Sequence, residues 1–119
     1  MIRRVPSGLK FDLRARNGQT VLTSEVYTTE AACRKGIESV ITNAPLARLE
    51  NQTQEPFQKQ ANPKFEMYLD KRGDYRFRLK ARNGQIIAVS DSYSAKASCL
   101  NGIESVKLNA PESEIILEE

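Results

Sequence analysis

A line of basic side chains runs along two stretches of the chain, with one residue separating most neighbours. We call this set the basic ladder: Lys10, Arg14 and Arg16 in the first stretch, and Arg76, Arg78, Lys80 and Arg82 in the second. Asp12 interrupts the first stretch. Every second residue of a β-strand points to the same face, so each stretch places its cations on one face of a predicted strand. A sheet face lined with cations could bind the phosphate backbone of a nucleic acid or another polyanion.

An ordinary solvated strand face is the competing interpretation of the basic ladder, and we favour it. Proteins that bind single strands usually add aromatic side chains that stack on bases, and Tyr68 is the one aromatic residue expected on this face. Glu66 and Asp70 share the face on a neighbouring predicted strand, and Glu114 and Glu118 share it if the last strand pairs nearby. Opposite charges on adjacent strands are a usual means of stabilising a sheet.

The residue types that usually carry out catalysis are scarce. The chain has no histidine, which is the commonest general base and metal ligand. Cys33 and Cys99 form no CxxC pair, and we expect both to be buried on predicted helices. Glu38 and Glu104 could form a carboxylate pair, but no base, nucleophile or metal ligand accompanies them. We therefore predict a protein that is not an enzyme and that holds no metal or cofactor.

These residues belong to a unit that occurs twice. Residues 11–45 align with residues 77–111 at a constant offset of 66, and nineteen of the thirty-five aligned positions are identical. The alternation of apolar and polar residues predicts strands over 65–70, 75–82 and 85–90. An amphipathic helix follows. Its predicted buried stripe has spacings of four and three and consists of Cys99, Ile103 and Val106, with Cys33, Ile37 and Val40 in the first copy. A short strand over 113–118 comes next, so each copy is expected to run strand-strand-strand-helix-strand.

The Asn-Gly pair at the hairpin tip allows two registers. A two-residue loop would set Leu79 opposite Ala88. We predict instead a three-residue loop with a bulge and with Gly84 in the left-handed conformation, which sets Leu79 opposite Ile87 and gathers large apolar side chains on one face. The first copy would then place Leu13 opposite Val21.

The predicted helices have recognisable ends and one unusual residue each. Ser94 is the expected N-cap of the second helix, as is Thr28 in the first copy, and Asn-Ala-Pro at 43–45 and 109–111 ends both helices. Gly36 and Gly102 lie inside the helices, where glycine costs about 1 kcal/mol relative to alanine. Close approach to the sheet or to the other helix would offset this cost, and a ligand cleft is the alternative. Tyr27 and Tyr93 are expected to pack at the corner between strand and helix.

Two motifs, present in both copies, carry a family resemblance. An RxRNGQ-type hairpin occurs at Arg14–Gln19 and Lys80–Gln85, and GIESVxxNAP occurs at Gly36–Pro45 and Gly102–Pro111. With a tyrosine before each helix, these residues resemble the YegP-like family of small bacterial proteins of unknown function. The resemblance implies an α+β fold, in which the tandem repeats form one pseudo-twofold antiparallel sheet with two helices and exchange their C-terminal strands. It implies no activity, ligand or site residue.

The remaining expectations concern organisation and location. We predict a single domain over residues 1–119, with repeat one at 1–51, a flexible or loosely ordered linker at 52–63 and repeat two at 64–119. The first ten residues lack the apolar core of a secretory signal, and no run reaches the roughly 20 apolar residues of a membrane span, so we expect a cytoplasmic location. We expect a monomeric, non-enzymatic binding or interaction module of unknown partner, with weak nucleic-acid or polyanion binding as the alternative.

Overall fold

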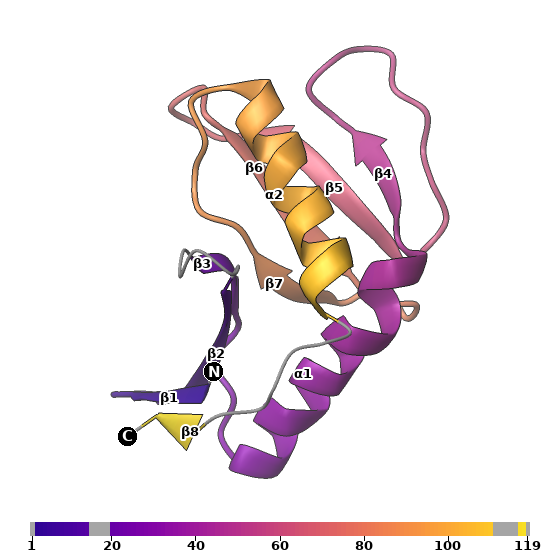
Figure 1. Cartoon of the computed structure of the whole chain (residues 1–119). Coiled ribbons are helices and arrows are strands. Elements are labelled where there is room, and N and C mark those ends of the chain that lie inside the picture. The colour runs from indigo at the N-terminus through magenta and orange to yellow at the C-terminus, as the bar shows by residue number, and fades with distance from the viewer. Residues whose placement is uncertain (1, 15–19, 111–116, 119) are drawn as a thin grey trace.

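The computed structural model describes residues 2–14, 20–110 and 117–118, which form one sheet and two α-helices (Figure 1). The strands are β1 (Ile2–Val5), β2 (Gly8–Arg14), β3 (Thr20–Ser24), β4 (Arg48–Asn51), β5 (Lys64–Leu69), β6 (Tyr75–Lys80), β7 (Ile86–Val89) and β8 (Leu117–Glu118). The helices are α1 (Glu30–Asn43) and α2 (Lys96–Asn109), and a 3-10 turn, η1 (Ala44–Leu46), follows α1.

The strand order is β4-β5-β6-β7-β3-β2-β1-β8, which confirms the α+β fold and the exchange of C-terminal strands. The strand that ends repeat one, β4, pairs with β5 of repeat two, and β8 of repeat two pairs with β1 of repeat one. Both exchanged strands pair in parallel, whereas the inner pairs are antiparallel. The sheet is therefore mixed rather than wholly antiparallel. Residues 52–63 supply the crossover that returns the chain to the starting end of β4, and parallel pairs require such a connection.

The hairpin register differs from the predicted one. The three-residue loop and the positive φ of Gly84 (85°) are present, and Ala81 N–H donates to the carbonyl of Gln85. Leu79, however, lies opposite Ala88 rather than Ile87, because Ile87 is the extra residue of a bulge. The bulge buries two consecutive side chains, Ile87 and Ala88, which a regular strand would place on opposite faces.

The same bulge recurs in repeat one. Leu13 lies opposite Leu22 rather than Val21, and Val21 and Leu22 are both buried. The copies therefore share an irregularity that alternation of side chains does not reveal.

The two helices cover one face of the sheet, and each contacts strands of both repeats. Helix α1 lies against β2 and β7, and α2 lies against β6 and β3 (Figure 1). The predicted helical stripes are buried: Cys33, Ile37 and Val40 in α1, and Cys99, Ile103 and Val106 in α2. Within the part of the chain that the structure describes, no helix has the length and apolar composition needed to cross a membrane.

The helix N-caps lie one residue later than predicted. Thr29 rather than Thr28 caps α1, and its hydroxyl accepts a hydrogen bond from Ala32 N–H. The equivalent residue of α2 is Ala95 rather than the predicted Ser94, and alanine offers no side-chain acceptor.

The glycines inside the helices permit close approach to a tyrosine and a phenylalanine, as expected. A Cβ atom at Gly36 would collide with the Tyr27 hydroxyl and the Phe11 ring. Tyr27 in turn stacks on Phe11, with ring centroids 6.2 Å apart. Gly102 makes the corresponding approach to Tyr93 and Phe77. Each tyrosine therefore packs at the corner between strand and helix.

Candidate functional site

The sheet face opposite the helices carries most of the basic ladder, and carboxylates neutralise much of its second half. Arg78 Nε lies 2.6 Å from Glu66 Oε1, and Arg76 Nε lies 3.0 Å from Asp70 Oδ2. Lys80 Nζ lies 3.9 Å from Glu66 Oε2. Glu66 and Asp70 thus lie beside the basic ladder, as predicted. Their pairing leaves little unbalanced positive charge along β6.

A buried ionic cluster continues from this pairing toward the sheet edge. Glu50 is only 1% exposed, and its carboxylate accepts hydrogen bonds from Lys64 Nζ (2.9 Å), Gln52 Nε2 (2.6 Å) and Gln60 N–H (2.7 Å). Burial opposes ionisation of Glu50, but these hydrogen bonds and the Lys64 charge prevail and lower its pKa from 4.5 to about 2. Gln52 and Gln60 belong to the segment expected to be flexible or loosely ordered, and these contacts tie it to β4.

The other members of the basic ladder lie apart from one another. Lys10 is half-buried on β2, Arg14 is exposed at the end of the same strand, and Arg82 is exposed in the β6–β7 loop. Arg16 lies outside the described residues, as does the acid Glu114. Among the acids considered for this face, Glu118 lies at the position opposite Arg3 in the β1–β8 pair.

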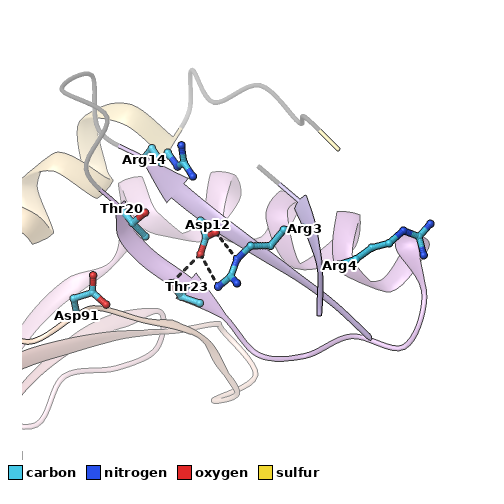
Figure 2. Close-up of a pocket in the computed structure, with 7 residues that line it drawn as sticks. All are labelled: Arg3, Arg4, Asp12, Arg14, Thr20, Thr23 and Asp91. Atoms are coloured by element: carbon cyan, nitrogen blue, oxygen red, sulfur yellow. Dashed lines mark hydrogen bonds and ion pairs between the residues drawn. The ribbon is translucent and has the colours of Figure 1, made fainter. Parts of the chain in front are cut away.

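A hollow of about 580 Å³ opens on the same face near the seam between the repeats (Figure 2). It is lined by charged and hydroxyl-bearing residues: Arg3, Arg4, Asp12, Arg14, Thr20, Thr23 and Asp91. Figure 2 shows Arg3 and Asp12 directed at one another, while Arg4 points away from them. Asp12 Oδ2 accepts from Arg3 Nε at 2.7 Å, and Asp12 Oδ1 accepts from the Thr23 hydroxyl at 2.9 Å.

The repeats differ at the positions that line this hollow. Thr20 and Thr23 of repeat one correspond to Ile86 and Val89 of repeat two at the offset of 66. Asp12 corresponds to Arg78, whose guanidinium lies 4.7 Å from the centre of the Tyr68 ring. At these matching positions, repeat one therefore carries two threonines and an aspartate around a hollow, and repeat two carries two aliphatic residues and a paired arginine. Only this comparison of open-face positions between copies, and not the shared motifs, points to the hollow in the sequence.

The residues considered for catalysis do not form a reactive centre. Cys33 and Cys99 are fully buried free thiols, and burial raises the pKa of both, that of Cys99 to about 11. Glu38 and Glu104 are exposed on their helices. Within residues 2–14, 20–110 and 117–118, no group of three or more histidine, cysteine or acidic residues is arranged to hold a metal ion.

Comparison with known proteins gives matches to both repeats. A family model described as a domain of unknown function, DUF1508, matches residues 9–50 and again residues 70–116. A UPF0339 protein of Methanosarcina acetivorans is 62% identical over 56 residues, which make up 47% of this chain and 97% of that protein. That relative is therefore about as long as one repeat.

Longer relatives and a solved structure match across both repeats. The UPF0339 protein of Photorhabdus laumondii is 42% identical over 95 residues, which cover 80% of this chain and 70% of that protein. The NMR structure of YegP from E. coli, described as a protein of unknown function, matches with a TM-score of 0.72 and 33% identity. This match covers 98% of our chain and 87% of YegP. The chain therefore belongs to the DUF1508 family, in the tandem form that shares its α+β fold with YegP, and the function of this family is unknown.

Proposed function

We propose that this chain is a non-enzymatic binding module, located in the cytoplasm, whose partner contacts the open sheet face at the hollow in repeat one. The observation that carries the proposal is the divergence of the two copies there. Thr20, Thr23 and Asp12 line the hollow, while Ile86, Val89 and Arg78 occupy the matching positions of repeat two. Asp12 and Arg78 each form an ion pair between the first two strands of their repeat, so the sheet accounts for that difference. Thr20 and Thr23 replace aliphatic residues that the same sheet accepts in repeat two, and this change supports a role in binding.

The chemistry of the hollow supports binding rather than catalysis. Arg14 and Asp91 are exposed and offer one charge of each sign to a polar partner. Asp12 is 6% exposed and is held by Arg3 and Thr23, which makes it a fixed wall rather than a mobile acid or base. The buried cysteines offer no accessible nucleophile to this hollow.

Weak polyanion binding through the basic ladder remains the alternative. The exposed Arg14 and Arg82 favour it, whereas the pairing of Arg76 and Arg78 with carboxylates weakens it. A fluorescence-anisotropy titration with a labelled single-stranded oligonucleotide at low and moderate salt separates the two. Phosphate-dominated binding falls steeply with salt. We expect no binding at either salt concentration, and steep salt-dependent binding would favour the polyanion alternative.

Affinity capture tests the hollow itself. Wild-type protein, the double variant Arg14→Ala/Asp91→Ala and the exposed-turn control Arg72→Ala are used as bait in nuclease-treated lysate, and captured material is identified by mass spectrometry. We expect the same partner with wild type and Arg72→Ala, and its loss with the double variant. Equal capture by all three proteins would place the binding surface elsewhere.

A further inference from the structure

A second cavity, of about 390 Å³, lies at the junction of the two repeats. Its lining comes from the first three turns of α1 and Tyr27 on one side, and from the β6–β7 hairpin on the other. The cavity therefore exists because α1 of repeat one packs against β7 of repeat two. We call it the junction cleft, and it is distinct from the hollow on the open face.

The junction cleft collects residues that are identical in the two copies. Six of them line it: Tyr27, Gly36 and Ser39 from repeat one, and Ala81, Asn83 and Gln85 from repeat two. Folding explains some of these identities. Gly36 permits close packing, and the side-chain Oδ1 of Asn83 accepts a hydrogen bond from Gln85 N–H in the turn. Folding does not explain Gln85, whose exposed side chain contacts Asn83 at 3.4 Å rather than the core.

The lining has a defined chemical character. Among the described residues around the junction cleft, Lys35 carries the one formal charge, and it is exposed on α1. Ser39 and Tyr27 add hydroxyl groups, and burial raises the pKa of Tyr27, which keeps its hydroxyl protonated as a donor. Ile87, Ala32 and Ala81 supply the apolar part of the lining. Clefts with an apolar lining and a few polar groups are the usual form of small-molecule sites.

We propose that the junction cleft binds a small carboxylate that carries an apolar group. Lys35 attracts the carboxylate, and the Tyr27 and Ser39 hydroxyls and the Gln85 amide orient it. Ile87 and the two alanines of the lining receive the apolar part. In the other copy Asn101 takes the place of Lys35.

Phenylacetate is a suitable probe, with neutral 2-phenylacetamide as the matched ligand of nearly the same shape. Ligands of about ten non-hydrogen atoms at about 0.3 kcal/mol per atom bind with Kd on the order of 1–10 mM, which amide chemical shifts in ¹⁵N–¹H NMR spectra can follow. We expect saturable shifts that centre on residues 27–39 and 81–87. We expect phenylacetamide to bind about fivefold more weakly, since a lost charged contact of about 1 kcal/mol corresponds to that ratio.

Two variants complete the test with the full chain. Lys35→Gln should weaken phenylacetate binding about fivefold and abolish the preference for the acid over the amide. Lys71→Gln, in the exposed turn at the opposite end of β6 from the hairpin, should leave both unchanged. Absence of saturation, shifts centred outside the two segments, or an unchanged preference in Lys35→Gln would each overturn the proposal.

Discussion

Arg3 and Asp12 form an ion pair across β1 and β2, with 2.7 Å between Arg3 Nε and Asp12 Oδ2. The corresponding strands of repeat two are joined by Glu66 and Arg78 at 2.6 Å, with the acid and the base on opposite strands from those in repeat one. The copies thus keep an ion pair between their first two strands while reversing its polarity. The reversal removes a cation from the centre of the basic ladder and creates one wall of the open-face hollow.

Replacing Asp12 with alanine is expected to lower the free energy of unfolding by about 1–3 kcal/mol, because Asp12 is buried and accepts from both a guanidinium and the Thr23 hydroxyl. Urea unfolding followed by circular dichroism measures the change. Asp91→Ala, on the exposed side of the same hollow, is the control and should change stability by less than about 0.5 kcal/mol. Equal effects of the two substitutions would show that the ion pair contributes nothing particular.

The stability of the chain is expected to fall on acidification through Glu50. Its pKa is lowered from 4.5 to about 2 in the folded protein, so the folded state binds the proton less readily than the unfolded state. The resulting stabilisation is fully present above pH 4.5 and is lost as the pH falls toward about 2. Each differential proton contributes up to about 1.4 kcal/mol per pH unit.

Glu50→Gln isolates this contribution from those of the other acids. The variant should be less stable than wild type at pH 7, and the difference between the two should shrink as the pH is lowered from about 5 to 3. Urea unfolding at several pH values gives the comparison. A difference that stays constant with pH would mean that Glu50 has an ordinary pKa.

The α2 N-terminus offers a stabilising substitution. Ala95 has backbone angles of −122° and 141°, close to the −132° and 154° of Thr29, whose side chain caps α1. Ala95→Thr should therefore add the missing cap and raise the free energy of unfolding by about 1 kcal/mol, while Thr29→Ala should lower it by a similar amount. Ser94→Ala, at the residue before the cap, should have little effect in the same thermal or urea unfolding experiment.

Replacing Gly36 with alanine is not expected to stabilise the chain, although alanine usually stabilises a helix relative to glycine. An exposed helical glycine gains about 1 kcal/mol when replaced by alanine, but a Cβ atom here would overlap the Tyr27 hydroxyl and the Phe11 ring. Gly36→Ala should therefore destabilise the chain by about 1–3 kcal/mol. Tyr27→Phe removes the overlapping oxygen, so the double variant Gly36→Ala/Tyr27→Phe should recover part of the lost stability. If the stability changes of the two single variants simply add in the double variant, the contact with the Tyr27 hydroxyl is not the cause.

Much of the fold could be predicted from the sequence because its main signals are local. Alternation located β5 and β6, the four-and-three spacing located the buried face of α2, and Gly84 marked the hairpin loop correctly. The register could not be predicted, since the bulge at Ile87 buries two neighbouring residues, and strict alternation assigns them to opposite faces.

The candidate sites depend on contacts between distant segments, which composition does not reveal. The sequence around Glu50 does not indicate its burial, which arises only when residues 52–63 fold back over β4. The junction cleft lies between the GIESVxxNAP motif of repeat one and the RxRNGQ-type hairpin of repeat two. Strand exchange brings these two motifs together. Both motifs were recognised as repeats, but their proximity required the strand order.

The exchange of C-terminal strands ties the two repeats together at both edges of the sheet, where β4 pairs with β5 and β8 pairs with β1. The fragment of residues 60–119 contains β5, β6, β7, α2 and β8 but lacks both β4 and β1, the partners of its first and last strands. Two fragments can restore the sheet if β8 of each pairs with β5 of the other, and a relative about one repeat long shows that a single copy occurs naturally. Sedimentation equilibrium of this fragment measures the outcome directly. A folded dimer is the predicted result, and a stable folded monomer would contradict the strand exchange.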